Sequence, residues 1–353
     1  MSAGSTDEDL LRKVAKRILT QSLSLKKGES LTVETWNNGL PFARQVVLEA
    51  RRMGAIPLLI LEDEDAYVRG VPVTPKDVLG RMGKHEYKLI SGTDAYVFIP
   101  GPVLGSYSRR LPRDEVASST AYGDGWYKAA AKAKLRGVRL AFGYIGEDAP
   151  SLLGKSIKTI VTHQLEAALA DYRGLGKKAR SLSSAMKKGA HGVVKTPGSK
   201  LELTFTGVHE LDDGVVDQKD LQEENNVCYI PPGYVYAGLE PSSVSGSFAF
   251  SPTVTRFGVI EDGSIEFKDG DVVGWSSKSS GPALEKLAAA ASANAKRASS
   301  LTVGLNPLLK YGYGQNSHSG GVIAVRALGV NFASRRASLK VDGKSLVSSG
   351  KLL

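Results

Sequence analysis

Cysteine is almost absent from the sequence: Cys228 is the only one among 353 residues. A single thiol cannot form an internal disulfide or supply a cysteine-rich metal site. Cys228 lies in a strand-like run from Val227 to Ile230. We therefore expect it to be a small buried hydrophobic side chain and not a nucleophile.

Long apolar runs are also lacking. No stretch of 18 or more apolar residues is present, which excludes a transmembrane helix by sequence. The segment from Met1 to Glu8 is small, polar and acidic, and it has neither the basic start nor the apolar region of a secretory signal. We expect a cytoplasmic protein that has no membrane partner.

Acidic residues are missing from two parts of a chain whose net charge is +10. Residues 173–200 contain eight Lys or Arg and no Asp or Glu, and residues 286–353 contain ten Lys or Arg and one acid, Asp342. No histidine follows His318. The first segment is a possible binding surface for an acidic protein or nucleic acid, or else a solubilising face. The second segment can supply few metal ligands.

The composition is that of a globular protein, because 42% of the residues are hydrophobic and 23% are charged. The length of 353 residues favours two domains. In the first half, expected strands alternate with helix-length segments, which favours a mostly parallel sheet covered on both faces. The run 57–61 is of the buried-strand type, and a long helix is expected over about 156–172. The expected strands are 30–35, 57–61, 94–99 and 138–145.

After Gly174 the pattern changes. The basic segment 173–200 suits a linker or an exposed helix-turn segment. Beyond it, apolar and polar residues alternate in short runs between tight turns, which is typical of an antiparallel sheet, and an alanine-rich helix is expected over 282–298. The sequence thus predicts an α/β fold. An N-terminal α/β domain with a mostly parallel sheet spans 1–175, and a C-terminal mixed α+β domain spans 176–353.

One segment carries a family resemblance. From Ile230 to Gly246 the chain reads IPPGYVYAGLEPSSVSG, which resembles without a gap the aminopeptidase T pattern IPTGEVFTAPDxxSVxG. Shorter matching pieces occur before and after this segment in the same order as in the family, and they are spread over nearly the whole chain. These pieces are Leu23–Glu29, Phe267–Gly270, Gly304–Pro307, Gly320–Gly329 and Val341–Lys344.

The resemblance implies an N-terminal α/β domain, a C-terminal catalytic domain and a homodimer closed through the C-terminal half. It also implies two divalent metals held by Glu, Glu, His and a closing His-x-Asp. The matching positions here are Tyr234, Ser300 and Ala324 or Val325, with Ser317 at a further family Glu, and the closing His is absent. Phenol, hydroxyl and methyl groups are poor substitutes for carboxylate and imidazole ligands. We therefore expect a divergent member without metal ligands, metal or cofactor.

Other residues could still hold a metal. Four possible ligands occur between His209 and Asp213, and His318 lies in a polar, glycine-rich loop. Short clusters of this kind are more often solvated turns, but His209, Asp212, Asp213 and His318 remain alternative ligands. Ser317 and His318 also resemble part of the iron site of the related 2,5-dihydroxypyridine dioxygenases, whose closing His and Asp are missing here.

Three functions follow as hypotheses. The first is a non-catalytic aminopeptidase T-like protein, a pseudoenzyme that acts in binding, scaffolding or assembly. The second is a metal-dependent aminopeptidase or other hydrolase with altered ligands. The third is a nucleic-acid-binding or ribosome-associated protein that uses its basic surface.

Overall fold

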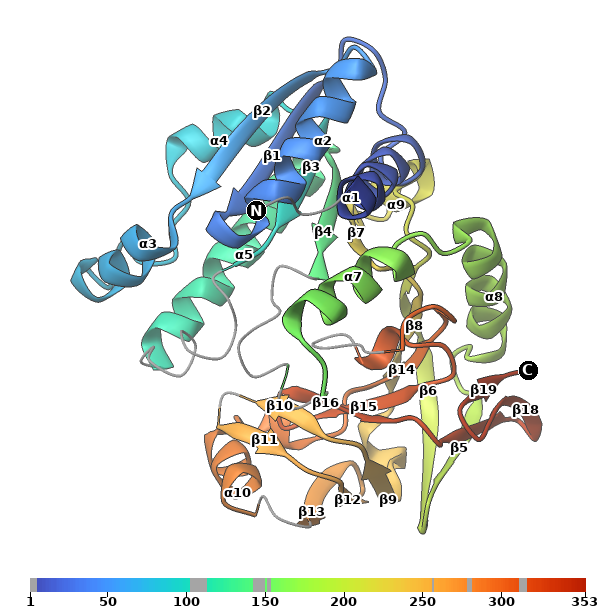
Figure 1. Cartoon of the computed structure of the whole chain (residues 1–353). Helices are drawn as coiled ribbons and strands as arrows, with labels where there is room; N and C mark the ends of the chain where they lie inside the picture. Colours follow the sequence, from blue (N-terminus) through green and yellow to red (C-terminus); the bar gives the residue numbers. More distant parts are fainter. Residues whose placement is uncertain are drawn as a thin grey trace. The chain divides into compact units, whose positions relative to one another are not determined.

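A computed structural model describes residues 5–101, 113–141, 150, 154–255, 257–277, 281–310 and 316–353. The chain forms two compact units (Figure 1). The N-terminal unit comprises 1–169 with 214–231, and the C-terminal unit comprises 170–213 with 232–353. The division into domains at residue 175 stays a prediction. The sequence segments Pro100–Gly105 and 142–145 lie partly or wholly outside the described residues.

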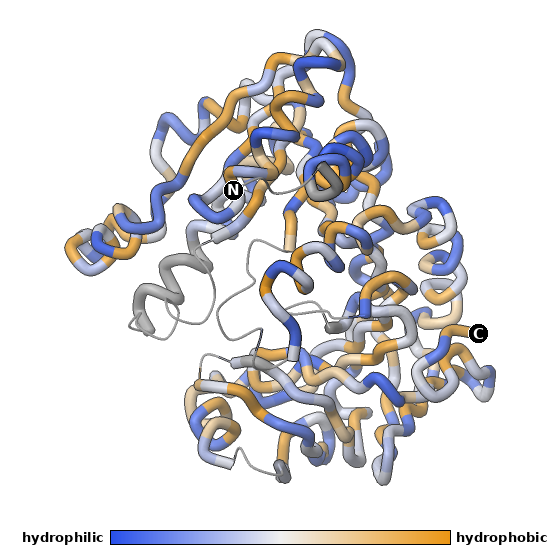
Figure 2. The backbone as a smooth tube through the Cα atoms, in the orientation of Figure 1, coloured by the Kyte–Doolittle hydropathy of each residue, from blue (hydrophilic) through white to orange (hydrophobic). Residues whose placement is uncertain are grey.

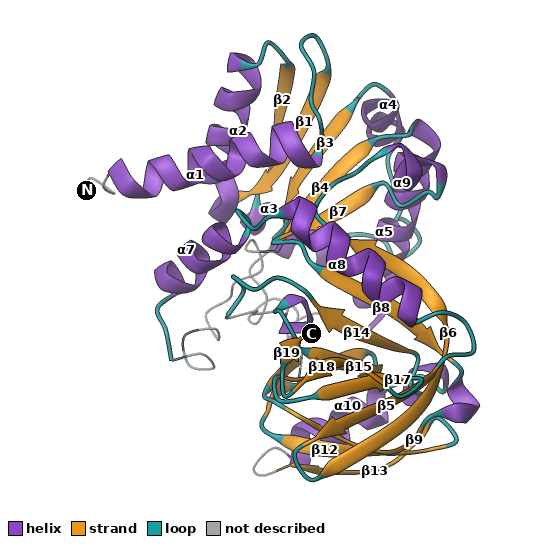
Figure 3. Cartoon of the chain, turned by 90° about the vertical axis from the view of Figure 1, so that its right-hand side faces the viewer, coloured by secondary structure: helices purple, strands orange, loops and turns teal. Residues whose placement is uncertain are grey.

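The N-terminal unit is built on a parallel sheet of five strands in the order β2-β1-β3-β4-β7. Helices α1 and α2 cover one face, and α4 and α5 cover the other (Figure 3). This confirms the predicted α/β class. The strands are β1 (Ser30–Trp36), β2 (Ile56–Glu62), β3 (Ala95–Ile99), β4 (Arg136–Leu140) and β7 (Val227–Ile230). The helices are α1 (Ser5–Arg17), α2 (Leu40–Arg52), α3 (Glu64–Gly70), α4 (Lys84–Ser91), α5 (Arg113–Ala133), α7 (Ile157–Ala167) and α9 (Gln218–Gln222).

Strand β2 corrects one prediction. The apolar run 57–61 was expected to be buried, yet Leu58 is 50% exposed and Leu61 is 47% exposed. The reason is topological, because β2 ends the sheet and only β1 pairs with it among the described strands. An apolar run therefore indicates a strand of a parallel sheet but does not reveal whether that strand is central or at the edge.

Two helices are shorter than expected. The helix predicted over 156–172 ends at Ala167, and a second helix, α8 (Tyr172–Ala185), begins in the C-terminal unit. The helix predicted over 282–298 is α10 (Gly281–Ala290), followed by a 3₁₀ turn at Asn294–Lys296. In both cases the helical pattern of the sequence continues beyond the residue at which the helix ends, Ala167 or Ala290.

The C-terminal unit contains a largely antiparallel sheet of twelve strands, whose main path is β16-β15-β14-β8-β6-β5-β17-β18-β19. Strand β9 pairs with β6 and β12, and β12 pairs with β13. A separate hairpin joins β10 (Thr253–Thr255) and β11 (Gly258–Ile260). The other strands are β5 (His191–Thr196), β6 (Ser199–Asp212), β8 (Tyr234–Leu239), β9 (Ser245–Phe250), β12 (Gly263–Lys268), β13 (Asp271–Ser277), β14 (Ser300–Gly304), β15 (Ile323–Ala327), β16 (Val330–Ser334), β17 (Ser338–Val341), β18 (Lys344–Ser348) and β19 (Lys351–Leu352).

The tyrosines near the family motif belong to different sheets. Tyr229 lies in β7 of the N-terminal unit, whereas Tyr234 and Tyr236 lie in β8 of the C-terminal unit. The intervening Pro231-Pro232-Gly233 ends the first strand, because proline lacks the N–H that a ladder needs. Cys228 is buried in β7, as predicted.

Candidate functional site

Three of the residues at the matched metal positions, Tyr234, Ser300 and Ala324, lie on one face of the C-terminal sheet. On adjacent strands, Tyr234 of β8 pairs with Asp212 of β6 on one side and with Gly304 of β14 on the other. Two residues along, Tyr236 pairs with Glu210 and Thr302. Because side chains alternate along a strand, these positions share a face.

The same face continues across β14 and β15. Ser300 precedes Thr302 by two residues in β14 and therefore lies on the same face, and Ala324 pairs with Thr302. The register therefore brings Tyr234, Ser300 and Ala324 to one side of the sheet. Ala324 contributes to an apolar cluster with Val322 and Ala333.

The segment Asn316–His318 forms a 3₁₀ turn beside the end of β14. A Cβ atom at Gly304 would overlap the backbone oxygens of Ser317 and Ser319, so glycine permits this close packing. Asn306 fixes the turn further, since its N–H donates to the His318 carbonyl at 3.0 Å. The result is that the His318 ring lies 4.3 Å from the Tyr234 ring, centroid to centroid, at an interplanar angle of 31°. Both residues are buried.

The hydroxyl of Tyr234 is hydrogen-bonded to a carboxylate. Its hydroxyl donates a hydrogen bond to Glu210 Oε1. Burial raises the pKa of Glu210 above its ordinary value, and the Tyr234 hydrogen bond opposes that rise. Glu210, Tyr234 and His318 thus form a connected cluster, and the buried Asp212 pairs with Tyr234 on the neighbouring strand.

The four alternative ligands do not meet at one point. Asp212 and His318 both adjoin Tyr234. His209 is exposed at a bulge of β6, where its ring lies 6.3 Å from that of Tyr236. Asp213 faces α8, where its Oδ2 is 4.0 Å from Arg180 Nη1. Within the described ranges, no three His, Cys, Asp or Glu side chains are grouped so as to hold a metal ion.

Ser300 and Ser317 are both buried. Ser300 Oγ has no hydrogen-bond partner among the described residues. A buried hydroxyl without a partner carries a desolvation cost, and nothing in the structure accounts for this one.

Glu210 is one of the four possible ligands between His209 and Asp213, but the sequence alone did not single it out. Strand periodicity was the missing signal, because in one strand Glu210 and Asp212 share a face while Asp213 points to the other. The bulge between Val208 and Glu210 moves His209 out of that simple alternation. The segment is a strand and not the solvated turn that short ligand clusters usually form.

A second half-buried carboxyl, Glu34, lies in the N-terminal unit, where no sequence motif marks it. Burial raises the pKa of Glu34 to about 7, a rise that the hydrogen bond from the Tyr96 hydroxyl opposes and that the carboxylates of Glu62 and Glu86 increase. The Tyr122 hydroxyl donates to Glu86. These side chains come from three strands and two helices of one unit.

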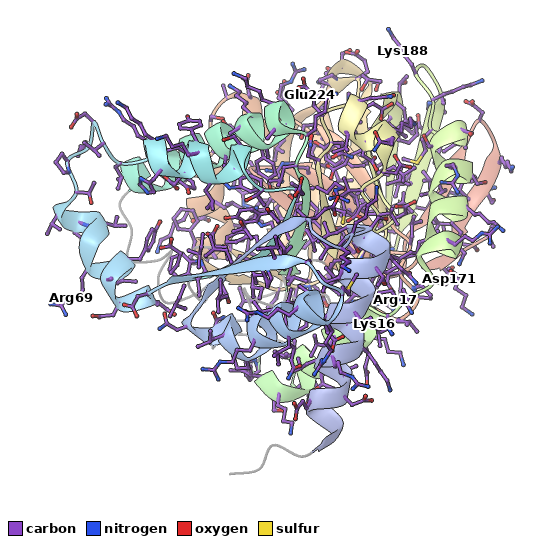
Figure 4. All side chains as sticks on the ribbon, turned by 90° about the horizontal axis from the view of Figure 1, so that it is seen from above. Lys16, Arg17, Arg69, Asp171, Lys188 and Glu224 are labelled. Carbon is purple, nitrogen blue, oxygen red and sulfur yellow. The ribbon has the colours of Figure 1, made fainter. Side chains whose placement is uncertain are left out.

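The basic segment 173–200 is an amphipathic helix followed by a hairpin. Helix α8 buries Leu175, Ala179 and Leu182, so this part of the chain is not a linker. Its charged residues are exposed, and the side chain of Lys188 points away from the fold at the end of the helix (Figure 4). The exposed basic side chains include Arg173, Lys177, Lys178, Arg180, Lys187 and Lys188.

On α7, His163 and Glu166 form a pair with His163 Nδ1 3.9 Å from Glu166 Oε2, as their spacing allows. No helix in the described part of the chain is both long and apolar enough to cross a membrane.

Comparison with known proteins gives a structural relationship. No family model matches the sequence, and no curated protein matches it. The fold is similar to that of wild-type AmpT from Thermus thermophilus, with a TM-score of 0.67 and 17% sequence identity. The similarity covers 98% of this chain and 99% of that chain. The chain therefore has, over its full length, the fold of an aminopeptidase T.

Proposed function

We propose that this protein is a non-catalytic relative of aminopeptidase T, which acts by binding a partner or ligand and not by metal-dependent hydrolysis. The proposal rests on the contacts that the Tyr234 side chain makes. At a position where the family pattern has a metal-binding Glu, its hydroxyl donates to Glu210 and its ring lies against His318.

The chemistry of the cluster supports this reading. Divalent metals in hydrolases need several anionic or imidazole donors that converge on one point. A tyrosine whose hydroxyl donates a hydrogen bond to a carboxylate keeps its proton and offers no phenolate. Ser300 and Ala324 supply neither charge nor imidazole. Without a metal to lower the pKa of a bound water, the cluster has no strong nucleophile at neutral pH.

The test is metal content together with peptidase activity. Protein purified by gel filtration should contain far less than one tightly bound divalent metal per chain by elemental analysis. It should not hydrolyse amino-acid anilides above background, with or without added zinc, cobalt or manganese. Stoichiometric metal, or metal-dependent turnover, would contradict the proposal.

A double variant provides a control on the site itself. Tyr234→Glu combined with Ser300→Glu restores two carboxylates. It does not restore the imidazole that the family pattern has where Ala324 stands, nor the closing ligands. We expect no aminopeptidase turnover, because a metal would remain under-coordinated and because buried carboxylates without partners are costly. Measurable turnover would show that other residues complete a working centre.

The second candidate is a hydrolase with altered ligands, favoured by the placement of Asp212 and His318 beside the same tyrosine. If the purified protein holds a metal, Asp212→Ala and His318→Ala should each release it. His209→Ala and Asp213→Ala serve as matched controls, since their side chains lie elsewhere.

Partner binding through exposed charge completes the proposal. The exposed basic side chains of α8 and the following hairpin present a surface for an acidic protein or nucleic acid. The resemblance further favours a homodimer closed through the C-terminal half.

A further inference from the structure

A cavity of about 440 Å³ opens on the C-terminal unit, outside the segments that carry the family resemblance. It lies where the ends of β9, β13 and β16 meet the start of β12 and the turn between β5 and β6. Its volume falls within the range of small-molecule sites, roughly 300–1,000 Å³. The polar side chains that line it are those of Ser251, Asp262, Ser276, Ser277, Ser334 and Arg336.

The cavity and the Tyr234 cluster lie on opposite faces of the sheet. Ala333 of β16 pairs with Ala324, which shares the face of Tyr234. Ser334 is the next residue along β16 and therefore points to the other face. What binds in the cavity is thus independent of whether a metal binds beside Tyr234.

Phe250 forms an apolar part of the lining. Its ring lies 4.8 Å from that of Phe332, centroid to centroid, and both residues are buried. Gly263 pairs with Phe250, and a Cβ atom at Gly263 would come within 2.9 Å of the Phe250 ring, so glycine permits this approach. Figure 2 shows that hydrophilic and hydrophobic residues alternate along the strands of this unit, which places polar side chains beside the apolar ones.

Serine hydroxyls supply most of the polar lining. A hydroxyl donates one hydrogen bond and accepts two, so Ser276, whose Oγ lies 2.9 Å from Ser264 Oγ, retains capacity for a further partner. Ser277 Oγ is buried and has no hydrogen-bond partner among the described residues. An unpaired hydroxyl in the wall of a cavity carries a desolvation cost, which a hydroxyl of a bound ligand can remove.

One acid and one base stand at the rim of the cavity. Asp262 and Arg336 are both exposed, and neither takes part in an ion pair within the described part of the chain. A carboxylate accepts hydrogen bonds, and a guanidinium donates them in pairs to adjacent acceptors. The two charges are opposite, so the rim as a whole does not select a ligand of either charge.

We propose that this cavity binds a neutral polyhydroxylated ligand, a mono- or disaccharide. Each hydroxyl of a sugar both donates and accepts, which matches the serines and the two charged side chains alike. The carbon-bound hydrogens of the sugar ring pack on Phe250 and Pro197. Every kind of group in the lining then has a partner.

Other ligands fit the lining less well. An apolar ligand would bury the serine hydroxyls without partners. A phosphate group would have one guanidinium to pair with and would share the cavity with the Asp262 carboxylate, which repels it. A small zwitterion such as an amino acid would pair with Asp262 and Arg336 but would leave the serine hydroxyls unfilled.

Saturation-transfer-difference NMR on the full-length chain tests the proposal. The neutral probes are glucose, galactose, mannose, maltose and lactose, and the charged comparisons are alanine and methyl phosphate. We expect saturation transfer to at least one sugar, with a dissociation constant in the millimolar range because the site is open to solvent.

Variants at the rim test whether binding occurs in this cavity. Asp262→Asn combined with Arg336→Gln should raise the dissociation constant of the bound sugar roughly tenfold, as expected when hydrogen bonds to charged groups are weakened. Arg335→Gln is the matched control, because Arg335 Nη1 donates to the Lys310 carbonyl at 2.7 Å and its side chain is not part of the lining.

Ser277→Ala separates binding from stability. Removing an unpaired buried hydroxyl should leave the midpoint of urea unfolding unchanged or higher, while sugar binding becomes weaker. A lower midpoint would mark Ser277 as a structural residue and would contradict its assignment to the site.

Three results would overturn the proposal. The first is the absence of saturation transfer to all five sugars. The second is sugar binding that Asp262→Asn with Arg336→Gln and Ser277→Ala both retain at wild-type strength. The third is transfer to alanine or methyl phosphate alone, which would assign the cavity to a charged ligand. Metal content and peptidase activity do not enter this assay, so its failure would leave the proposal for the Tyr234 cluster unaffected.

Discussion

Each unit of the chain contains a half-buried glutamate that accepts a hydrogen bond from a tyrosine, but the two glutamates have different neighbours. Glu34 accepts from Tyr96 between parallel strands, and Glu62 and Glu86 add negative charge to its surroundings. Glu210 accepts from Tyr234 between antiparallel strands, and burial alone raises its pKa. Burial thus raises the pKa of both carboxyls, and neighbouring carboxylates add to the rise only at Glu34.

The contrast bears on function. A carboxyl whose pKa is about 7 changes charge near neutral pH, which makes the Glu34 cluster sensitive to pH. In the Glu210 cluster, the Tyr234 hydroxyl donates to Glu210 and the Tyr234 ring lies against His318. Changes in the two clusters should therefore have unequal effects.

The largest effect is expected from Tyr234→Glu. The change removes the hydroxyl that donates to Glu210 and adds a third carboxylate beside those of Glu210 and Asp212. Breaking a buried polar pair and leaving an uncompensated charge costs about 3 kcal/mol or more of unfolding free energy. Urea unfolding at pH 8 measures the loss.

Two comparisons sharpen that result. Tyr234→Phe, which removes only the hydroxyl, should cost about 1 kcal/mol. If added zinc or manganese restored the stability of Tyr234→Glu, the cluster would still be able to assemble a metal site.

Glu34→Gln should change the pH dependence of stability. The folded state holds the Glu34 proton more tightly than the unfolded chain, whose ordinary pKa is 4.5. The contribution of Glu34 to the free energy of unfolding is therefore greatest below about pH 4.5. This contribution is lost as the pH rises through about 7. Glu34→Gln should be more stable than wild type at pH 8 by about 1–2 kcal/mol and should lose that advantage at pH 4.5.

Urea unfolding at several pH values checks this expectation. Glu210→Gln is the matched variant in the other sheet, and its gain at pH 8 should be smaller, since no carboxylate adds to the rise in its pKa. A pH-independent difference between Glu34→Gln and wild type would refute the assignment of Glu34 as the titrating group.

The smallest effect is expected at the basic helix. Changing Lys177, Lys178, Lys187 and Lys188 to Gln should leave stability unchanged, since all four are exposed. It should weaken salt-sensitive binding of generic single-stranded RNA, measured by fluorescence polarisation at two salt concentrations. Equal affinity of the variant and the wild type would exclude this surface as a polyanion site, and Arg335 and Arg336 would be the next to change.

Much of the fold could be predicted from periodicity. Alternating apolar strands and helices placed the parallel sheet, and short alternating runs placed the antiparallel one. Strand order could not be predicted, which is why Leu58 and Leu61 were expected in the core and lie at an edge. The break at Pro231-Pro232-Gly233 was visible in the sequence, but its consequence, that Tyr229 and Tyr234 lie in different sheets, depends on long-range pairing.

The candidate site was predictable only in part. The motif order located Tyr234, Ser300, Ser317 and Ala324, and the register shows that three of them share a face. The partners of Tyr234 could not be found in this way, because Glu210 and His318 reach it from positions 24 and 84 residues away in the chain. Such contacts are set by sheet register and by the close packing at Gly304.

The most direct test of the central claim is anomalous X-ray scattering from crystals of the protein soaked in manganese or zinc. The account predicts no anomalous peak on the face formed by β6, β8 and β14, with the Tyr234 hydroxyl still bonded to Glu210. A metal peak coordinated by Asp212, Glu210 or His318, with Tyr234 displaced, would contradict it.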